Sequence, residues 1–382
     1  MTYIERQISD KLLADIEPNK VVLLTGARRT GKTWLMKQIT KQIKGKLLEL
    51  NGEDTSDQEL FEPINKEHYM LIFGKYDYVF VDEAQKIADV GSKLKFLVDN
   101  INNIKVMATG SSAFDITRQF GEPLTGRKKT QHLYPFSVQE FMNQESIRET
   151  QGKLPERLIY GSYPELVNMQ TRQQKEDYLY ELADDYLFKD ILTFDGIKNS
   201  DIIRNLLRLI AFQVGNEVSH SELANKLQVH KDTISRYLNL LSKVFIIFKI
   251  EGFSQNLRKE ITKMHRWYFY DNGIRNLLIK NFNPLELRND QGQLWENYMI
   301  AERVKYQSYN SLHTSNYFWR TYDKQEIDWI EQSGGKLKAY EMKWNPKKTV
   351  KPPSAWQKAY PEASFDVIHP KNYLSWLSNQ PN

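Results

Sequence analysis

The segment GARRTGKT, residues 26–33, has the residue types and spacing of a loop that binds phosphate groups, G-x-x-x-x-G-K-[ST]. Its glycines let the backbone fold around a phosphate with amide N–H groups turned inward, and the helix expected after it adds a positive N-terminal end. Lys32 is expected to reach the β- and γ-phosphates of ATP, and Thr33 to ligate Mg²⁺. The candidate nucleotide contacts are Gly26, Ala27, Arg28, Arg29, Thr30, Gly31, Lys32, Thr33 and Trp34.

A second motif, YDYVFVDEAQ, supplies acidic residues of the kind that a bound nucleotide requires. The apolar run Tyr78–Val81 predicts a buried strand that carries Asp82 to the carboxyl edge of a parallel sheet, where ligands bind in open α/β folds. There Asp82 is expected to hold Mg²⁺ through water, and Glu83 to polarise the attacking water. The alternative is that both acids only begin a helix, where acidic residues are common.

Two further stretches offer groups for the γ-phosphate. The short apolar strand predicted at Val106–Ala108 is followed by hydroxyl side chains, of which Ser111 is the first candidate for a phosphate contact and Ser112 the second. Either serine could equally belong to an ordinary turn. In LTGRKK, Arg127 could stabilise transition-state charge within the chain or across the interface of a homo-oligomer. An exposed loop arginine without such a role is the alternative.

Buried strands must position these groups. Val21–Leu24, directly before the phosphate loop, is a continuous apolar run, as expected for a parallel strand covered on both faces. Strand, tight loop and helix therefore follow one another in the order that this chemistry needs. We expect an α/β fold with a parallel-sheet P-loop core.

A C-terminal stretch, AYEMKWN at 339–345, places a carboxylate and an ammonium two residues apart. In a strand, Glu341 and Lys343 share one face. The simplest interpretation is a surface ion pair, which contributes little to stability. The alternative is a metal-dependent nuclease site, because the preceding strand of a predicted hairpin carries Asp328 and an upstream helix carries Glu296.

These four residues resemble the site of PD-(D/E)XK nucleases, which has a helix glutamate, a hairpin aspartate and a Glu-x-Lys pair. Glu296, Asp328 and Glu341 are the candidate metal ligands, because the hard ions Mg²⁺ and Mn²⁺ prefer oxygen. Lys343 is the candidate catalytic lysine, positioning water and offsetting charge on the phosphate. A fold of this kind can also lose catalysis and keep nucleic-acid binding.

The P-loop, VDEAQ, TGSSA, LTGR and LYPFSVQEF occur in this order and resemble an AAA+-type ATPase. More narrowly, the chain is similar to a bacterial and archaeal group of AAA-family ATP-binding proteins. In that group the ATPase is joined to a C-terminal domain of unknown function that resembles restriction endonucleases. YGSYPELV at 160–167, DYLFKDIL at 185–192 and YFYDNGIRNLL at 268–278 also look like that group's patterns. The resemblance implies a helical lid over residues 151–200.

The stretch SHSELANKLQVHKDTISRYLNLLSK predicts two helices joined by a short turn, followed by the strand VFIIFKI. This is the arrangement of a winged helix. The exposed face of its second helix would carry Lys231, Ser235, Arg236 and Asn239. Winged helices read DNA or serve only as packing modules, and residues 201–255, with 7 Lys+Arg against 5 Asp+Glu, leave both open.

Length and charge suggest several domains. A chain of 382 residues exceeds one ordinary core. After residue 255 it holds 19 Lys+Arg against 13 Asp+Glu and seven of its eight tryptophans. We expect a P-loop core at 1–150, the lid at 151–200, a winged helix at 201–255 and a restriction-endonuclease-like α/β domain at 256–382. The basic excess marks the C-terminal part as the place for an anionic partner such as DNA.

The remaining composition favours a cytoplasmic protein with no membrane association. There is no cysteine, so a disulfide framework is excluded. The start, MTYIERQISDKLL, lacks the basic and apolar regions of a signal peptide. No apolar run approaches the roughly 18 residues that a membrane span needs.

Two functions are compatible with these features. The first is an enzyme: an ATPase whose nucleotide cycle controls a nuclease-like C-terminal domain that acts on DNA. The second is an ATP-driven switch or tether, in which the C-terminal domain binds a partner without cleaving it.

Overall fold

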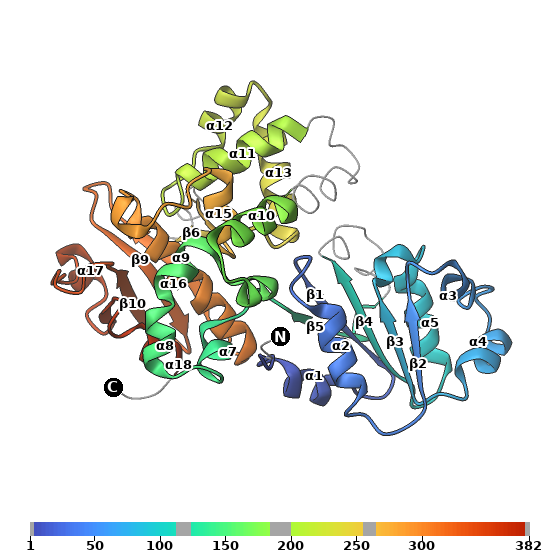
Figure 1. Ribbon diagram of the computed structural model, residues 1–382. Coiled ribbons are helices and arrows are strands. Elements are labelled where there is room, and N and C mark those ends of the chain that lie inside the picture. Colours follow the sequence, from blue (N-terminus) through green and yellow to red (C-terminus); the bar gives the residue numbers. More distant parts are fainter. Residues whose placement is uncertain (1–3, 112–123, 184–199, 255–264, 379–382) are drawn as a thin grey trace. The chain divides into compact units, whose positions relative to one another are not determined.

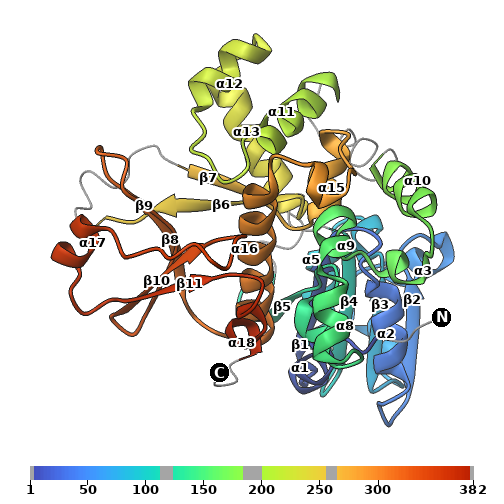
Figure 2. The ribbon, with the colours of Figure 1, turned by 60° about the vertical axis from the view of Figure 1, so that its left-hand side comes forward.

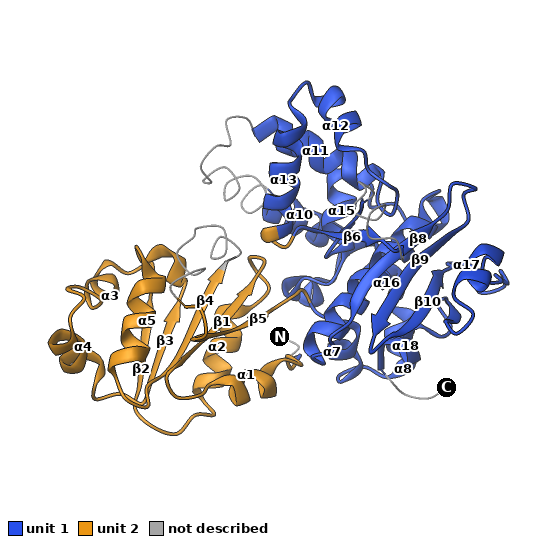
Figure 3. Ribbon diagram, turned by 180° about the vertical axis from the view of Figure 1, so that it is seen from behind, with its two compact units in different colours: residues 1–4, 136–242, 246–382 blue, residues 5–135, 243–245 orange. Residues whose placement is uncertain are grey.

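The structure, a computed structural model, describes residues 4–111, 124–183, 200–254 and 265–378 (Figure 1). The chain divides into two compact units (Figure 3). Unit 2 comprises residues 5–135 and 243–245, and unit 1 comprises residues 1–4, 136–242 and 246–382. Within the described ranges no helix is both long and apolar enough to cross a membrane.

Unit 2 is built on a five-stranded sheet in which every pairing is parallel, in the order β2-β3-β4-β1-β5. The strands are β1 (Lys20–Gly26), β2 (Leu47–Asn51), β3 (Tyr78–Asp82), β4 (Lys105–Ser111) and β5 (Lys128–His132). The apolar runs of β1, β3 and β4 are buried, as expected for central strands covered on both faces. The parallel-sheet core predicted from the sequence is therefore present.

Helices cover this sheet and provide its core. They are α1 (Ser9–Asp15), α2 (Lys32–Thr40), α3 (Thr55–Glu59), α4 (Lys66–Phe73), the 3-10 turn η1 (Ala84–Lys86) and α5 (Val90–Asn100). Alternate residues of β1, β3 and β4 pack with apolar side chains of α4 and α5 in one cluster. The helix after the phosphate loop, α2, packs against β1 and β4.

Unit 1 contains a six-stranded mixed sheet in the order β11-β10-β9-β8-β6-β7. Its strands are β6 (Ile247–Gly252), β7 (His265–Phe269), β8 (Ser315–Arg320), β9 (Glu326–Ser333), β10 (Lys336–Met342) and β11 (Ser364–Ile368). Strands β8, β9 and β10 form an antiparallel meander, and β11 lies parallel to β10. Figure 2 shows the sheet with the long helix α16 (Gln291–Tyr309) beside it, which contacts β7 and β10.

The other helices of unit 1 come before, between and after these strands. They are α7 (Val138–Met142), α8 (Ile147–Gly152), α9 (Leu154–Tyr160), η2 (Pro164–Asn168), α10 (Arg172–Leu182), α11 (Ser200–Phe212), α12 (His220–Leu227), α13 (Lys231–Lys243), α15 (Asn272–Leu278), η4 (Leu285–Leu287), α17 (Ser354–Ala359) and α18 (Tyr373–Ser378). The helix–turn–helix expected in the middle of the chain corresponds to α12 and α13, with Gln228 in a left-handed conformation between them.

One sheet spans the boundary that composition suggested near residue 255. Strand β6 pairs antiparallel with β7 on one side and parallel with β8 on the other. The β6–β7 pair therefore follows α12 and α13, as a wing would, and also belongs to the C-terminal sheet. The division of unit 1 into a lid, a winged helix and a nuclease-like domain stays a prediction.

Two sequence motifs meet through a buried carboxylate. Asp271, 4 % exposed, accepts hydrogen bonds from the backbone amides of Ser162 (2.7 Å) and Gly273 (2.8 Å). Gly161 has a φ of +80°, and an ideal Cβ placed there would lie 1.9 Å from Oδ1 of Asp271. The aspartate of YFYDNGIRNLL thus occupies the space that a side chain would need at the glycine of YGSYPELV. The third motif, at 185–192, lies outside the described residues.

We expect Gly161→Ala to destabilise unit 1 by more than about 3 kcal/mol, because the new methyl group cannot fit beside a carboxylate held by backbone amides. Gly335→Ala is the matched control: Gly335 has nearly the same φ, +78°, but nothing lies within 4 Å of its ideal Cβ. It should cost only the backbone strain, about 1 kcal/mol. Urea unfolding followed by tryptophan fluorescence measures both, and equal losses would contradict the proposed clash.

Candidate functional sites

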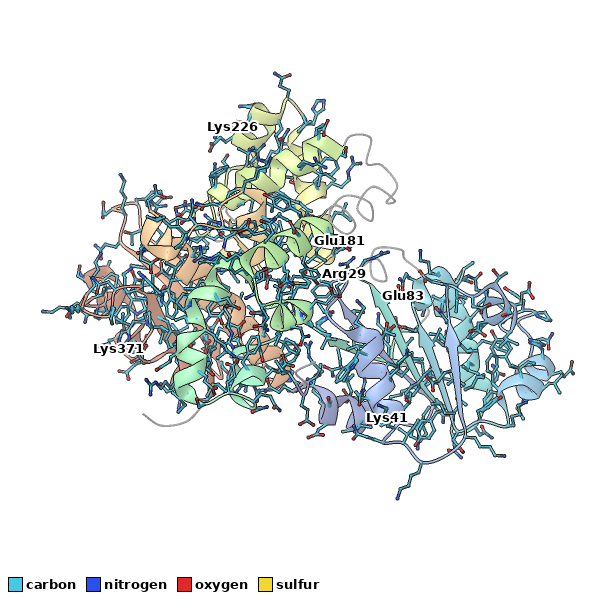
Figure 4. The ribbon with its side chains drawn as sticks, in the orientation of Figure 1. Arg29, Lys41, Glu83, Glu181, Lys226 and Lys371 are labelled. Carbon is cyan, nitrogen blue, oxygen red and sulfur yellow. The ribbon has the colours of Figure 1, made fainter. Side chains whose placement is uncertain are left out.

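The phosphate loop lies between β1 and α2, as the sequence predicted. Gly31 caps α2 with a φ of +94° and no side-chain hydrogen bond. Arg29, which is labelled in Figure 4, also has a left-handed backbone. Lys32 is 5 % exposed, and its Nζ donates to the carbonyl oxygens of Gly26 (3.0 Å) and Ala27 (2.8 Å). The ammonium is therefore held inside the loop by the loop's own backbone.

An N-terminal arginine that the sequence did not single out supports this loop. The buried guanidinium of Arg6 donates to the carbonyl oxygens of Thr30 (2.9 Å) and Tyr134 (2.6 Å). The hydroxyl of Thr30 donates to the carbonyl oxygen of Ala27 (2.8 Å). Arg6 thus ties the loop to the segment that follows β5. Because Arg6 is far from the loop in the sequence, no local sequence pattern predicts that the two are in contact.

The acidic pair after β3 lies at the same edge of the sheet as the loop. β4 runs between β1 and β3, and Ser111 at its end pairs with Gly26. The hydroxyl of Thr109 on β4 donates to Asp82 and accepts from the backbone amide of Glu83 (3.2 Å). Glu83 has a left-handed backbone, and its carboxylate accepts a hydrogen bond from Gln85. Thr109 therefore holds the carboxylate of Asp82 and the backbone of Glu83.

The three remaining candidates for the γ-phosphate differ in their placement. The backbone of Ser111 reaches the carboxyl edge, whereas Ser112 lies outside the described residues. Arg127 precedes β5, its carbonyl oxygen accepts from the amide of Val21 (2.8 Å), and its Nε donates to Asp99 (2.8 Å). Arg127 therefore lies at the edge formed by the amino ends of the strands, whereas the loop lies at the edge formed by their carboxyl ends. The structure does not bring it to its own chain's loop, and a role across subunits stays a prediction.

The C-terminal candidates gather in unit 1, from α16, β9 and β10. Glu341 is 7 % exposed and its Oε1 lies 2.5 Å from Nζ of Lys343. The ion pair thus exists, but it is not a pair on an open surface. Oδ2 of Asp328 accepts from the amide of Met342 (2.9 Å), and the hydroxyl of Tyr268 donates to Oε1 of Glu296 (2.8 Å).

A second cation in this cluster was not foreseen. Arg266 of β7 is 3 % exposed, and its Nη1 lies 3.8 Å from Oε1 of Glu296 and 3.7 Å from Oδ1 of Asp328. Its Nη2 donates to Glu326 (2.9 Å). Among the described residues, no group of three His, Asp or Glu side chains is disposed to hold a metal ion. Two of the predicted metal ligands, Glu296 and Asp328, thus lie beside an arginine, and the third, Glu341, pairs with Lys343.

Comparison with known families gives three matches. Residues 18–142 match an AAA domain, residues 151–285 match a domain of unknown function (DUF8612), and residues 291–379 match another domain of unknown function (DUF4143). The first match covers the loop and β3, which carry the nucleotide-site candidates. The part of the chain that carries these candidates is therefore similar to an AAA domain.

Relatives that match two thirds or more of this chain occur in bacteria and archaea. An uncharacterized protein of Haemophilus influenzae is 25 % identical over 289 residues, covering 67 % of this chain and 68 % of the relative. An uncharacterized protein of Methanocaldococcus jannaschii is 26 % identical over 333 residues, covering 80 % of this chain and 74 % of the relative. Among solved structures, a Walker-type ATPase of Pyrococcus abyssi is similar with a TM-score of 0.49 and 16 % identity, covering 72 % of this chain and 96 % of that chain.

The three acids of the unit 1 cluster have raised pKa values. Burial, and next the charge of Asp328, raises the pKa of Glu296 to about 8. The same two causes raise the pKa of Glu341 to about 7. Burial also raises the pKa of Asp328. The folded state therefore keeps protons on these acids at pH values where the unfolded chain has already released them. The stability that these bound protons contribute is present at low pH and is lost as the pH rises through about 7 to 8.

We expect the unfolding free energy of unit 1 to fall by about 1–3 kcal/mol between about pH 5 and pH 8.5. Glu296→Gln keeps the side-chain shape, cannot ionise and should reduce this fall. Glu222→Gln, which alters a glutamate on α12 that pairs with Lys226, is the control and should leave the fall unchanged. Urea unfolding across this pH range tests the prediction, and an unaltered pH dependence in Glu296→Gln would contradict it.

Proposed function

We propose that this chain binds and hydrolyses ATP at the carboxyl edge of the unit 2 sheet. The observation that carries the proposal is the adjacency of β1, β4 and β3, which end at one edge. Lys32 would contact the β- and γ-phosphates, and Glu83 would polarise the attacking water. Ser111, on the strand between them, is the candidate contact for the γ-phosphate.

The residues present fit a nucleotide with Mg²⁺. The N-terminus of α2 has no side-chain cap, so its amides suit an anion. Thr33 is exposed in the first turn of α2, and Asp82 lies at the end of β3. These two residues would hold Mg²⁺, which supplies positive charge at the phosphates during hydrolysis. Thr109, bonded to Asp82 and to the amide of Glu83, would keep the acids in place.

Lys32→Ala is expected to abolish ATP hydrolysis and weaken ATP binding, because it removes a cation from the phosphates. Glu83→Gln should retain ATP but hydrolyse it at least about 100-fold more slowly, because only the polarisation of water is lost. Lys41→Ala, the same substitution beyond the other end of α2, serves as the control and should keep the wild-type rate. Phosphate release and nucleotide-binding titrations distinguish the two effects, and a wild-type rate in Glu83→Gln would refute the role of this residue.

For unit 1 we propose a nuclease-like domain that acts in a nucleotide-dependent switch. Support comes from the order α16, β8, β9, β10, α17, β11, a helix and antiparallel meander followed by a helix and a parallel strand. Lys231, Arg236 and Asn239 are exposed on α13 and offer a surface for DNA. Because Arg266 lies among the acids, binding of a partner without cleavage is the function that this arrangement favours.

Metal-dependent cleavage of DNA is the second candidate. It is favoured by the approach of Lys343 to Glu341 and by the nearness of Asp328 and Glu296 to each other, since both lie within 4 Å of Arg266. The two functions predict different results with DNA and Mg²⁺ or Mn²⁺.

The switch predicts DNA binding that changes between ATP and ADP, with intact DNA throughout. Cleavage predicts shortened DNA that requires Lys343 and Asp328. A filter-binding or anisotropy titration run beside a gel assay, with wild type, Lys343→Ala and Asp328→Asn, measures both. Cleavage by wild type that is lost in both variants would overturn the switch. DNA binding that is the same with ATP and ADP would contradict coupling between the nucleotide and the DNA.

A further inference from the structure

The acidic cluster of unit 1 has its positive charge already built in. Arg266 approaches Glu296 and Asp328 with one nitrogen, at 3.8 and 3.7 Å, and Glu326 with the other, at 2.9 Å. The guanidinium carbon lies 4.5 Å from the centre of the Phe318 ring, which limits the space on one side. This arginine therefore lies between carboxylates that come from a helix and from a strand.

One oxygen of each acid that a divalent ion would need already accepts a hydrogen bond. Oε1 of Glu296 accepts from Tyr268, Oδ2 of Asp328 accepts from an amide, and Oε1 of Glu341 accepts from Lys343. Magnesium and manganese require several oxygen ligands at roughly 2.0–2.2 Å. In the described part of the chain, no three acids or histidines are disposed in this way. The residues present do not fit a metal ion as they stand.

One atom nevertheless indicates that the cluster is not fully satisfied. Oε2 of Glu341 is buried without a hydrogen-bond partner. A buried carboxylate oxygen without a donor is costly, because it has lost water and gained nothing. A cluster whose charges were arranged only for stability would be expected to provide a donor here. This oxygen is the one that a positively charged ligand would engage first.

We propose that Arg266 is an internal counter-ion that takes the place of the metal and excludes a divalent cation while it remains there. A guanidinium and a divalent cation repel each other at this distance, and both compete for Glu296 and Asp328. Removal of the arginine's charge leaves three acids that attract a metal. The inference rests on the nuclease-like placement of these residues proposed above, but it concerns metal binding and not cleavage.

Calorimetric titration of the full chain with MnCl₂, without nucleotide, tests this directly. Wild type should show no saturable binding. Arg266→Gln should bind one Mn²⁺ per chain with an affinity at least about tenfold above the detection limit of the titration, and adding Asp328→Asn should abolish this binding. Arg320→Gln, the same substitution on β8 at a residue paired with Glu217, is the control and should behave as wild type.

A second variant keeps the test available if Arg266→Gln does not fold. Arg266→Gln with Glu326→Gln removes one positive and one negative charge, so net charge is unchanged while Glu296, Asp328 and Glu341 remain. It should also gain one Mn²⁺. Saturable binding of equal affinity in wild type, or no gain in either variant, would overturn the inference. A gain of metal without any DNA cleavage would uphold it and remove only the cleavage candidate.

Discussion

Unit 1 depends on polar contacts between two segments more than 100 residues apart. The carboxylate of Asp271 accepts amide donors from the segment after α9 and from the start of α15. The side-chain amides of Asn272 and Asn276 donate to the last carbonyl groups of α9. A helix end buried without such partners would be unstable, and here side chains of the following helix supply them. The positions of α16 and β7 follow, because Asn297 on α16 bonds both to Asn272 and to the backbone of Phe269.

Strand β7 connects this polar framework to two other parts of unit 1. His265 lies beside His220, at the start of α12, with ring centres 6.1 Å apart. The next residue is Arg266, among the acids, and Tyr268 bonds to Glu296. The helix–turn–helix and the acidic cluster therefore share one short strand. A change in the position of this strand would alter both, which is the property that a switch requires.

Much of this could be predicted from local patterns. The phosphate loop, β3 and the β9–β10 hairpin are each formed by one short continuous segment. Their side chains lie where the strand period and the spacing of the motif residues predict. Arg6, Thr109 and Arg266 could not be found in this way, because their partners are distant in the sequence and an arginine or threonine has no local signature. The placement of Arg127 could not be predicted for a different reason. A residue directly before a parallel strand lies at the amino edge, but the parallel pairing of β5 with β1 is not visible in the sequence.

The place of β6 within the six-stranded sheet limits how the chain can be divided. A fragment beginning after residue 255 would contain β7 and β8 but would lack the strand that lies between them. The freed edge of β8 would present a row of unpaired N–H and C=O groups, which is a template for pairing with another chain. Such a fragment is expected to self-associate through this edge, or to exchange strands between copies. The smallest piece that retains the C-terminal sheet must therefore include β6 and, because of Asp271, the helices that begin near residue 136.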